Sequence, residues 1–192
     1  MNAKRNETSQ KILSSAFQCI ADHGCNSVTL REIAEHAGVA LSQLNYYHKN
    51  KEVLFSEVLK SMKQDYVQHV ISNMEERQSI QEKTRFLIEY NKHLLTTNEA
   101  LYRAFLDFFN LAMWSESFRK EMNDFLDGIT NAIEKQIREN RSSQENGSAH
   151  LPAPLTRMIL ATTFGIAMQF LMHPEREDAL DGFDILLALI EK

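Results

Sequence analysis

The chain runs for 151 residues before its first proline. All three prolines (Pro152, Pro154 and Pro174) lie in the last quarter, and only 6 glycines occur among the 192 residues. Sheet-rich and disordered chains need far more turn and breaker residues, since Gly plus Pro average about 12% of ordinary proteins. Proline also breaks a helix interior, so helices are the elements that can run so far without it. We therefore expect an all-α fold.

The spacing of apolar residues places the helices. The first helix carries a 3.6-residue period and stops at Gly24; its apolar positions are Ile12, Leu13, Ala16, Phe17 and Ile20. Thr29-Leu-Arg-Glu32 is typical of a capping box that begins the second helix. A third helix is expected at about 41–47, and Asn50 is a suitable N-cap for a long fourth one. The remaining helices are expected at about 80–97, 99–112, 115–140, 154–172 and 176–190. This gives about nine helices and no strand, with residues 141–150 as the most loop-like segment.

Charge is unevenly distributed along the chain. The net charge is −5, but residues 1–60 hold 7 Lys/Arg and 6 Asp/Glu, whereas the remainder holds 14 and 20. A near-neutral N-terminal segment followed by an acidic remainder fits a small DNA-binding module attached to a larger acidic domain.

Cysteine, metal and membrane signals are weak. Cys19 and Cys25 suit a reducing compartment and form no zinc spacing, so buried thiols are expected and a redox-sensing pair is the alternative. The seven histidines are scattered, and we expect no metal and no cofactor. No apolar stretch approaches the roughly 18 residues that span a bilayer, and the N-terminus is polar, so a cytoplasmic protein without membrane contact is expected.

Residues 29–47 have the pattern of a helix-turn-helix. Ala34 supplies the small side chain that lets two helices cross, Gly38 accepts the positive φ of the turn, and Val39 fixes the turn to the core. The helix that follows is then free to place polar groups in a major groove about 12 Å wide. Short helices joined by a glycine also occur in proteins that never touch DNA.

Residues 10–55 resemble the N-terminal DNA-binding domain of the TetR family of bacterial transcriptional repressors. The resemblance rests on Ile12-Leu-Ser-Ser-Ala-Phe17, Gly24, Val28-Thr-Leu-Arg-Glu-Ile-Ala34, Ala37-Gly-Val39, Tyr46-Tyr47 and Lys51-Glu-Val-Leu54. The rest of the chain fits the family in length and helix count and is loosely similar to members with a choline-repressor-like C-terminal domain. The resemblance implies a DNA-binding domain at 1–50 and a helical effector-binding and dimerisation domain at 51–192.

The resemblance also implies roles for the matched residues. In the family, residues of the recognition helix contact bases or phosphates, and residues at the starts of the second and fourth helices contact phosphates. The DNA-binding residues that this implies are Thr29, Arg31, Ser42, Gln43, Asn45, Tyr46, Tyr47 and Lys51. Their chemistry agrees, because Gln bonds adenine bidentately while Thr, Tyr and Lys suit phosphates. Arg31 as a solvated helix residue and Tyr46 as a packing residue are the alternatives.

Several positions depart from the family pattern. Ala40 stands where a capping Ser is frequent, Asn45 where Tyr is usual, and His48 where a Phe normally packs behind the recognition helix. A neutral imidazole fills part of that space, but protonating it when buried is costly. We therefore expect weaker DNA binding or lower stability at acidic pH.

Aromatic and sulfur residues gather in the larger domain. Either they pack the core, or they line an apolar effector pocket of the kind family members use; the candidates are Phe86, Tyr90, Tyr102, Phe105, Phe108, Phe109, Trp114, Phe164 and Met168. Asn91, His93 and Asn110 are candidates for orienting hydrogen bonds.

The last two helices carry more apolar surface than one edge of a monomer needs. Family resemblance places the dimer interface there, which would set two recognition helices about 34 Å apart on a palindromic operator. The predicted protein is a ligand-responsive homodimeric repressor that a small apolar or amphipathic effector releases from double-stranded DNA. The alternatives are a helical cytosolic enzyme and a helical adaptor without DNA affinity; no clustered catalytic motif supports the enzyme.

Overall fold

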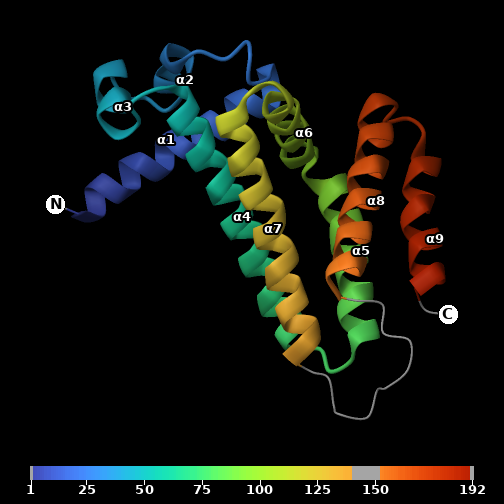
Figure 1. Ribbon diagram of the computed structural model, residues 1–192. Helices are drawn as coiled ribbons and strands as arrows, with labels where there is room; N and C mark the ends of the chain where they lie inside the picture. The colour runs from blue at the N-terminus through green and yellow to red at the C-terminus, as the bar shows by residue number, and fades with distance from the viewer. Residues whose placement is uncertain (1, 140–151, 191–192) are drawn as a thin grey trace. The chain divides into compact units, whose positions relative to one another are not determined.

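The computed structural model describes residues 2–139 and 152–190. Within these ranges the chain forms nine α-helices and one 3-10 turn, with no strand (Figure 1). The helices are α1 (Asn2–His23), α2 (Leu30–His36), α3 (Leu41–Tyr47), α4 (Lys51–Glu75), α5 (Ile80–Thr97), α6 (Glu99–Trp114), α7 (Glu116–Glu139), α8 (Pro152–Met172) and α9 (Asp181–Ile190), and the 3-10 turn η1 is Glu177–Leu180. The predicted all-α class is confirmed. The loop predicted at 141–150 lies outside the described residues.

Contacts divide the chain into two compact units. The first unit comprises the described residues of Met1–Gln64 and Arg103–Phe125, and the second those of Asp65–Tyr102 and Leu126–Lys192. Helices α4, α6 and α7 each contribute to both units. The boundary predicted at residue 50 separates a DNA-binding domain from an effector-binding domain, whereas the two units are defined by contacts between residues. The predicted boundary therefore stays a prediction.

Two glycines and a capping box set the bounds of the first three helices, the long α1 and the short α2 and α3. Gly24 and Gly38 have φ values of +79° and +62°; this left-handed conformation was predicted for Gly38, and Gly24 ends α1 as predicted. Ala34 and Leu44, on the helices joined by the second turn, are buried, and Val39 donates its backbone N–H to Ala34 O at 3.0 Å. The turn is thereby fixed against the core and α3 begins at a defined angle.

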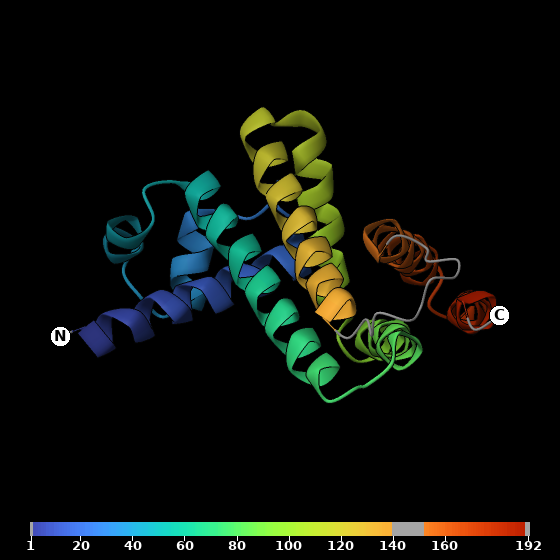
Figure 2. The ribbon, with the colours of Figure 1, turned by 60° about the horizontal axis from the view of Figure 1, so that its bottom comes forward.

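The core of the first unit is aromatic. Phe108 of α6 meets Phe55 of α4 edge-on at 5.9 Å between ring centroids, and it stacks on Phe118 of α7 at 5.4 Å. All three rings are buried. Helices α4 and α7 run side by side in both views of the ribbon (Figure 1, Figure 2). These contacts hold the start of α4, which directly follows the helix-turn-helix.

The second unit packs α5 against α8 and α9. Helix α5 begins at a capping box in which Ser79 and Glu82 exchange hydrogen bonds. Lys83 is buried and donates from Nζ to Gln136 O at 2.7 Å. That carbonyl belongs to the last turn of α7, where helices lack internal partners, so the lysine satisfies it and opposes the negative end of the helix dipole.

One sequence expectation was wrong at the C-terminal end. A single helix was predicted over 176–190, whereas the chain forms η1 and then α9, because Asp181 N–H bonds to Asp178 O and Ala179 O in a tighter turn. By length and composition alone, Pro154–Met172 is one helix in the described ranges that could cross a bilayer, and core helices of soluble proteins meet the same criterion.

Candidate functional site

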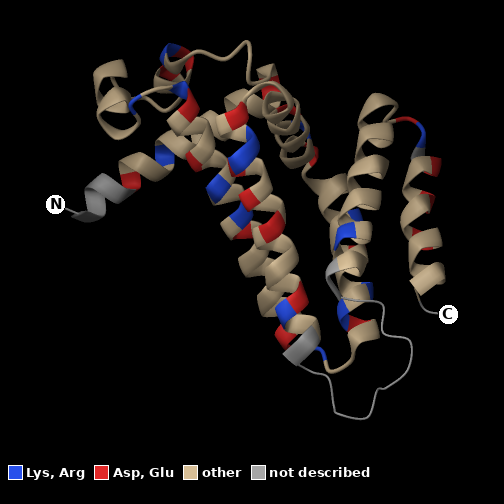
Figure 3. Ribbon diagram, in the orientation of Figure 1, with Lys and Arg blue, Asp and Glu red and all other residues tan. Residues whose placement is uncertain are grey.

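Helix α3 presents an uncharged polar surface. Ser42, Gln43, Asn45 and Tyr46 are exposed, whereas Leu44 is fully buried and holds the helix to the core. The helix carries no charged residue (Figure 3). Tyr47 is half-buried, with its ring edge-on to that of Tyr46 at 5.5 Å. The side chains predicted to read bases therefore lie on the exposed face of this short helix.

The start of α2 has the predicted capping box. Thr29 N–H donates to Glu32 Oε2 at 2.7 Å, and Glu32 N–H donates to Thr29 Oγ1 at 3.2 Å. These bonds to Thr29 lower the pKa of the Glu32 carboxyl. Arg31 is exposed and pairs with Glu35 at 3.2 Å, a contact that exposed side chains exchange easily for a phosphate. Its role in DNA binding stays a prediction.

The start of α4 is capped as predicted. Asn50 Oδ1 accepts the Val53 N–H at 2.8 Å. Lys51 is half-buried, and its Nζ lies 5.3 Å from the centroid of the Phe55 ring. This cation–π contact orients the ammonium without neutralising it. The lysine predicted to meet a phosphate is therefore held at a fixed place, directly after the helix-turn-helix.

His48 is completely buried behind the recognition helix. Its Nδ1 lies 3.0 Å from Glu57 Oε2, and its Nε2 has no hydrogen-bond partner among the described residues. Burial lowers the pKa of the imidazole, and the Glu57 carboxylate opposes part of that effect. The expectation that an imidazole occupies the space behind α3 is confirmed.

The His48→Phe variant is expected to remove an acid sensitivity. Because the folded pKa lies below the usual value of about 6.5, the unfolded chain binds more protons than the folded chain at mildly acidic pH. Stability is therefore full at neutral pH and falls as the pH drops through about 6.5. Urea unfolding at a series of pH values measures this, with His36→Phe, at an exposed histidine, as control. Parallel pH profiles for wild type and His48→Phe contradict the prediction.

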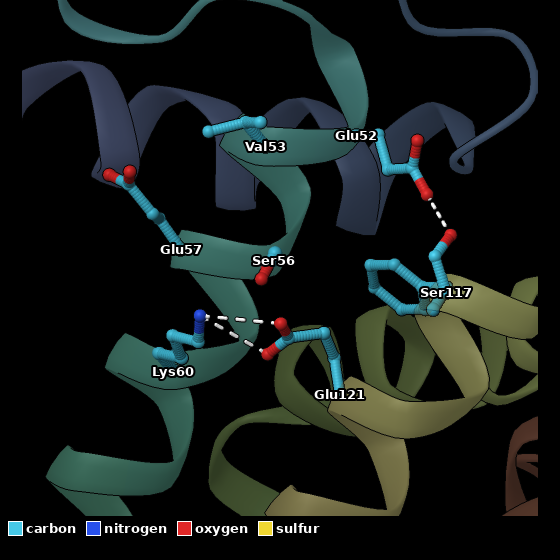
Figure 4. Close-up of a pocket in the computed structure, with 8 residues that line it drawn as sticks. Glu52, Val53, Ser56, Glu57, Lys60, Ser117 and Glu121 are labelled. Atoms are coloured by element: carbon cyan, nitrogen blue, oxygen red, sulfur yellow. Dashed lines mark hydrogen bonds and ion pairs between the residues drawn. The ribbon is translucent and has the colours of Figure 1, made fainter.

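A polar pocket of about 310 Å³ lies between α4 and α7 in the first unit (Figure 4). Lys60 Nζ pairs with Glu121 Oε2 at 3.2 Å, and the Ser117 hydroxyl donates to Glu52. Lys63 Nζ also donates to Asp124 O at 3.4 Å. Sequence reasoning missed these bonds, since they join residues about sixty positions apart. They hold the first turns of α4 against α7.

The turn between α1 and α2 is bound by a residue of α6. Cys25 N–H donates to Asp107 Oδ2, and Cys25 itself is buried. Burial and, next, the hydrogen bond to Asp107 raise the pKa of the Cys25 thiol; burial also raises the pKa of Cys19. Both thiols are therefore poor nucleophiles, which favours the interpretation of buried thiols over a redox pair.

The nine predicted effector residues are shared between the two units. In the first unit Phe105 and Phe108 are packed in the core, whereas Phe109 is 45% exposed and Trp114 is 86% exposed. In the second unit Tyr102 is buried, Met168 is half exposed, and Phe86, Tyr90 and Phe164 are half-buried. Core packing therefore accounts for the buried rings of the first unit. The assignment of the nine to an effector pocket stays a prediction.

Three helices of the second unit share a buried polar cluster. Asn91 Nδ2 donates to Tyr66 Oη at 3.0 Å, and the Tyr102 hydroxyl donates to Asn91 Oδ1 at 3.2 Å. Burial raises the pKa of both tyrosines. Asn91 and Tyr102 were candidates from the sequence, but Tyr66 was missed because its position on the apolar stripe of α4 is typical of packing. A second group lies beside it: His69, Tyr90 and Phe86 stack in sequence, at 4.6 and 5.7 Å between centroids.

The last two helices leave apolar side chains exposed. Helix α8 holds a single charged residue, Arg157, and only 39% of its most apolar 18-residue stretch is buried. The exposed large apolar residues on the two helices are Met158, Met168, Met172, Ile185 and Leu189. Both views place α8 and α9 side by side (Figure 1, Figure 2).

Two short helices joined through a positive-φ glycine, the second of them exposed and polar, define a helix-turn-helix DNA-binding protein. Residues 12–58 match the family model of bacterial regulatory proteins of the TetR family, and residues 81–192 match that of the C-terminal region of BetI-type transcriptional repressors. The chain belongs to the TetR family. It is accordingly a DNA-binding transcriptional regulator that responds to a small-molecule effector.

Relatives cover almost the whole chain. The fatty acid metabolism regulator protein of Bacillus subtilis is 25% identical over 191 residues, which is 99% of this chain and 96% of the relative. The crystal structure of FadR from Bacillus subtilis in complex with stearoyl-CoA has a TM-score of 0.80 at 22% identity, covering 94% of this chain and 96% of that one. A regulator from Saccharomonospora viridis in complex with choline has a TM-score of 0.81 at 20% identity, covering 97% and 96%. The two structures share the fold of this chain.

Proposed function

We propose that the chain is a homodimeric repressor that binds a palindromic operator and is released by a long-chain acyl thioester. The observation that carries the DNA-binding part is α3, whose polar residues face solvent while Leu44 fixes the helix behind them. Operator binding takes place in the cytoplasm, where the chromosome lies.

The DNA contacts divide by chemistry. Ser42, Gln43, Asn45 and Tyr46 on α3 read base edges. The phosphate contacts come from the start of α2, the end of α3 and the start of α4, through Thr29, Arg31, Tyr47 and Lys51. Exposure of the α3 side chains and the fixed position of Lys51 support this division.

The dimer forms through α8 and α9. Five large apolar side chains are exposed on these two helices, and a groove of about 540 Å³ runs along α8, η1 and α9 between Ile166 and Ile185. Soluble monomers rarely leave a large exposed apolar surface uncovered. A second copy of the chain covers it, and two-fold symmetry then presents one recognition helix to each half of a palindrome.

The effector is amphipathic. Support for an acyl thioester is the similarity, along almost the whole chain, to a fatty acid metabolism regulator, together with the polar cluster of Tyr66, Asn91 and Tyr102 in the second unit. The hydroxyl and amide groups of that cluster, which now bond to one another, would turn to a carbonyl of the ligand, and the neighbouring rings would contact its apolar chain. Choline is the second candidate, because a structural neighbour binds it and because the stacked Phe86 and Tyr90 rings suit a quaternary ammonium.

Footprinting on the DNA upstream of the protein's own gene tests the proposal. The purified protein is expected to protect a palindrome in the presence of competitor DNA. Micromolar stearoyl-CoA is expected to abolish protection, whereas free CoA and choline leave it intact. By linkage, operator DNA must weaken stearoyl-CoA binding by the same factor, which calorimetry measures.

Each outcome has a definite interpretation. If choline alone releases the protein from DNA, the effector is a quaternary ammonium compound and not an acyl thioester. Absence of any protected site, with protein shown to be folded by circular dichroism, overturns the repressor and leaves a helical enzyme or adaptor.

A further inference from the structure

The polar pocket between α4 and α7 has an excess of negative charge. Its lining, all from the first unit, contains three carboxylates and one ammonium, those of Glu52, Glu57, Glu121 and Lys60. Lys60 Nζ lies 3.4 and 3.2 Å from the two carboxylate oxygens of Glu121, so these two side chains neutralise each other (Figure 4). The charges of Glu52 and Glu57 remain.

These two carboxylates have no cationic partner among the described residues. Glu52 accepts a hydrogen bond from the Ser117 hydroxyl, and Glu57 Oε2 lies 3.0 Å from Nδ1 of His48. Burial lowers the pKa of that imidazole, so the ring is mainly neutral at neutral pH and does not balance the charge of Glu57. In the described ranges, neither carboxylate pairs with a lysine or an arginine. The pocket therefore favours a cationic ligand, because a cleft lined by one sign of charge concentrates the opposite charge.

Ser56 adds a buried hydroxyl without a partner. The residue is 9% exposed and lines the pocket, and its hydroxyl forms no hydrogen bond with any described residue. Figure 4 shows Ser56 with Glu52 and Glu57 on opposite sides of it. Most buried polar side-chain atoms have a hydrogen-bond partner, so this hydroxyl indicates that the ligand carries a donor. An ammonium group is such a donor, and it has no acceptor that would be left unpaired.

The spacing of the two carboxylates suits a ligand with two ammonium groups. Glu52 and Glu57 are five residues apart on α4, which is about 7.5 Å along the helix axis. The two ammonium groups of the linear diamine cadaverine, when extended, are separated by a similar length. Val53, which is 38% exposed, and the ring of Phe118 give the same pocket an apolar wall that methylene groups can contact.

A metal ion suits the pocket less well. The volume of about 310 Å³ is far more than a bare ion occupies, and the apolar part of the wall offers no ligand atoms. In the described part of the chain, no group of three His, Cys, Asp or Glu side chains is placed to hold a metal ion. An organic cation therefore accounts for more of the lining than a metal ion does.

We propose that the α4–α7 pocket is a binding site for a short aliphatic diamine. One ammonium group pairs with Glu57 and the other with Glu52. The Ser56 hydroxyl accepts a further N–H, and the methylene chain lies against Val53 and Phe118. This site goes beyond the proposed function and does not depend on it, because none of these residues is among the predicted DNA or effector contacts.

Calorimetric titration of the purified full-length protein tests the site. It is carried out at neutral pH and physiological salt, where long-range attraction to an acidic surface is largely screened. The probes are cadaverine, pentylamine, which has the same chain length but one ammonium group, and magnesium chloride. The variants are Glu52→Gln, Glu57→Gln and Ser56→Ala. The matched control is Glu116→Gln, at an exposed glutamate of α7 outside the pocket.

Cadaverine is expected to bind wild type about tenfold more tightly than pentylamine does, because it forms a second charge-assisted hydrogen bond. In Glu52→Gln and in Glu57→Gln, the affinity for cadaverine is expected to fall to that of wild type for pentylamine. Ser56→Ala is expected to weaken cadaverine binding about threefold, since a hydrogen bond to a neutral hydroxyl contributes less. Glu116→Gln is expected to bind cadaverine like wild type.

Three results overturn the proposal. Equal affinities of wild type for cadaverine and pentylamine, or a loss in Glu116→Gln as large as that in Glu52→Gln, mean attraction to the acidic surface as a whole. Binding of magnesium without binding of cadaverine means a metal site. If Glu57→Gln does not fold, because this glutamate also contacts His48, the exposed Glu52 decides: an unchanged affinity for cadaverine in Glu52→Gln overturns the proposal, and a tenfold loss supports it.

Discussion

Replacing Leu189 with Glu is expected to make the protein monomeric and to weaken operator binding by at least about a hundredfold. Leu189 is 65% exposed on α9, and Ile185 lies one turn earlier on the same face. In the proposed dimer both side chains are covered by a second copy. A carboxylate placed there would be buried without a partner in both copies, which costs several kcal/mol and exceeds what the lost leucine contact contributes. Each monomer then holds a single half-site.

Analytical ultracentrifugation and operator titration measure the two effects together. The control is Met113→Glu, which places the same charge on an exposed apolar residue of α6, outside α8 and α9. A dimeric Leu189→Glu variant with wild-type operator affinity would place the interface elsewhere.

Gln43→Ala and Lys51→Ala are expected to weaken DNA binding in different ways. Loss of a bidentate base contact costs about 1–3 kcal/mol and relaxes specificity at one position of each half-site. Loss of a phosphate contact weakens binding to all sequences and lowers the slope of log affinity against log salt by about 1 per contact. Gln43 is exposed on α3, whereas Lys51 is half-buried at the start of α4, so the two substitutions separate the reading of bases from the binding of phosphates.

Operator titrations at several salt concentrations, repeated on operators with one substituted base pair, give both readouts. The matched controls are Gln18→Ala on α1 and Lys120→Ala on α7, because both side chains are exposed and neither belongs to the predicted DNA contacts. Equal losses on operator and on random DNA in Gln43→Ala would remove this residue from base recognition.

Local structure was predictable from the sequence where one short signal suffices. The Thr29–Glu32 capping box, the Asn50 cap and the positive φ of Gly38 each follow from neighbours within four residues, and all three are present. The bounds of α5 were likewise predicted, since a polar break before residue 80 and an apolar stripe after it agree. The turn η1 was missed because residues 176–180 contain no Gly or Pro. Only its tighter hydrogen bonds distinguish this turn from the start of an α-helix.

Contacts between distant residues were not predictable in this way. Asp107 stands in an aromatic run and bonds an amide 82 positions earlier, and a lone carboxylate between Phe105 and Phe108 was the only available signal. The apolar spacing of α6 also could not separate Phe108, which is fully buried, from Trp114, which is 86% exposed. Periodicity gives the face of a helix, but the partner of that face is set by tertiary packing.

Because α4 is long, a small tilt of this helix produces a large displacement of Lys51 at its start. Lys51, beside the recognition helix, and Tyr66, in the polar cluster, are separated by fifteen residues of one helix, or about 22 Å at 1.5 Å per residue. A tilt of about 5° around Tyr66 therefore moves Lys51 by about 2 Å, enough to break a hydrogen bond to a phosphate. In the proposed symmetric dimer the same displacement would occur in the DNA-binding domain of each copy, and the two displacements would add across the operator. Under the proposed function, a ligand that tilts α4 would therefore weaken operator binding through the length of this helix.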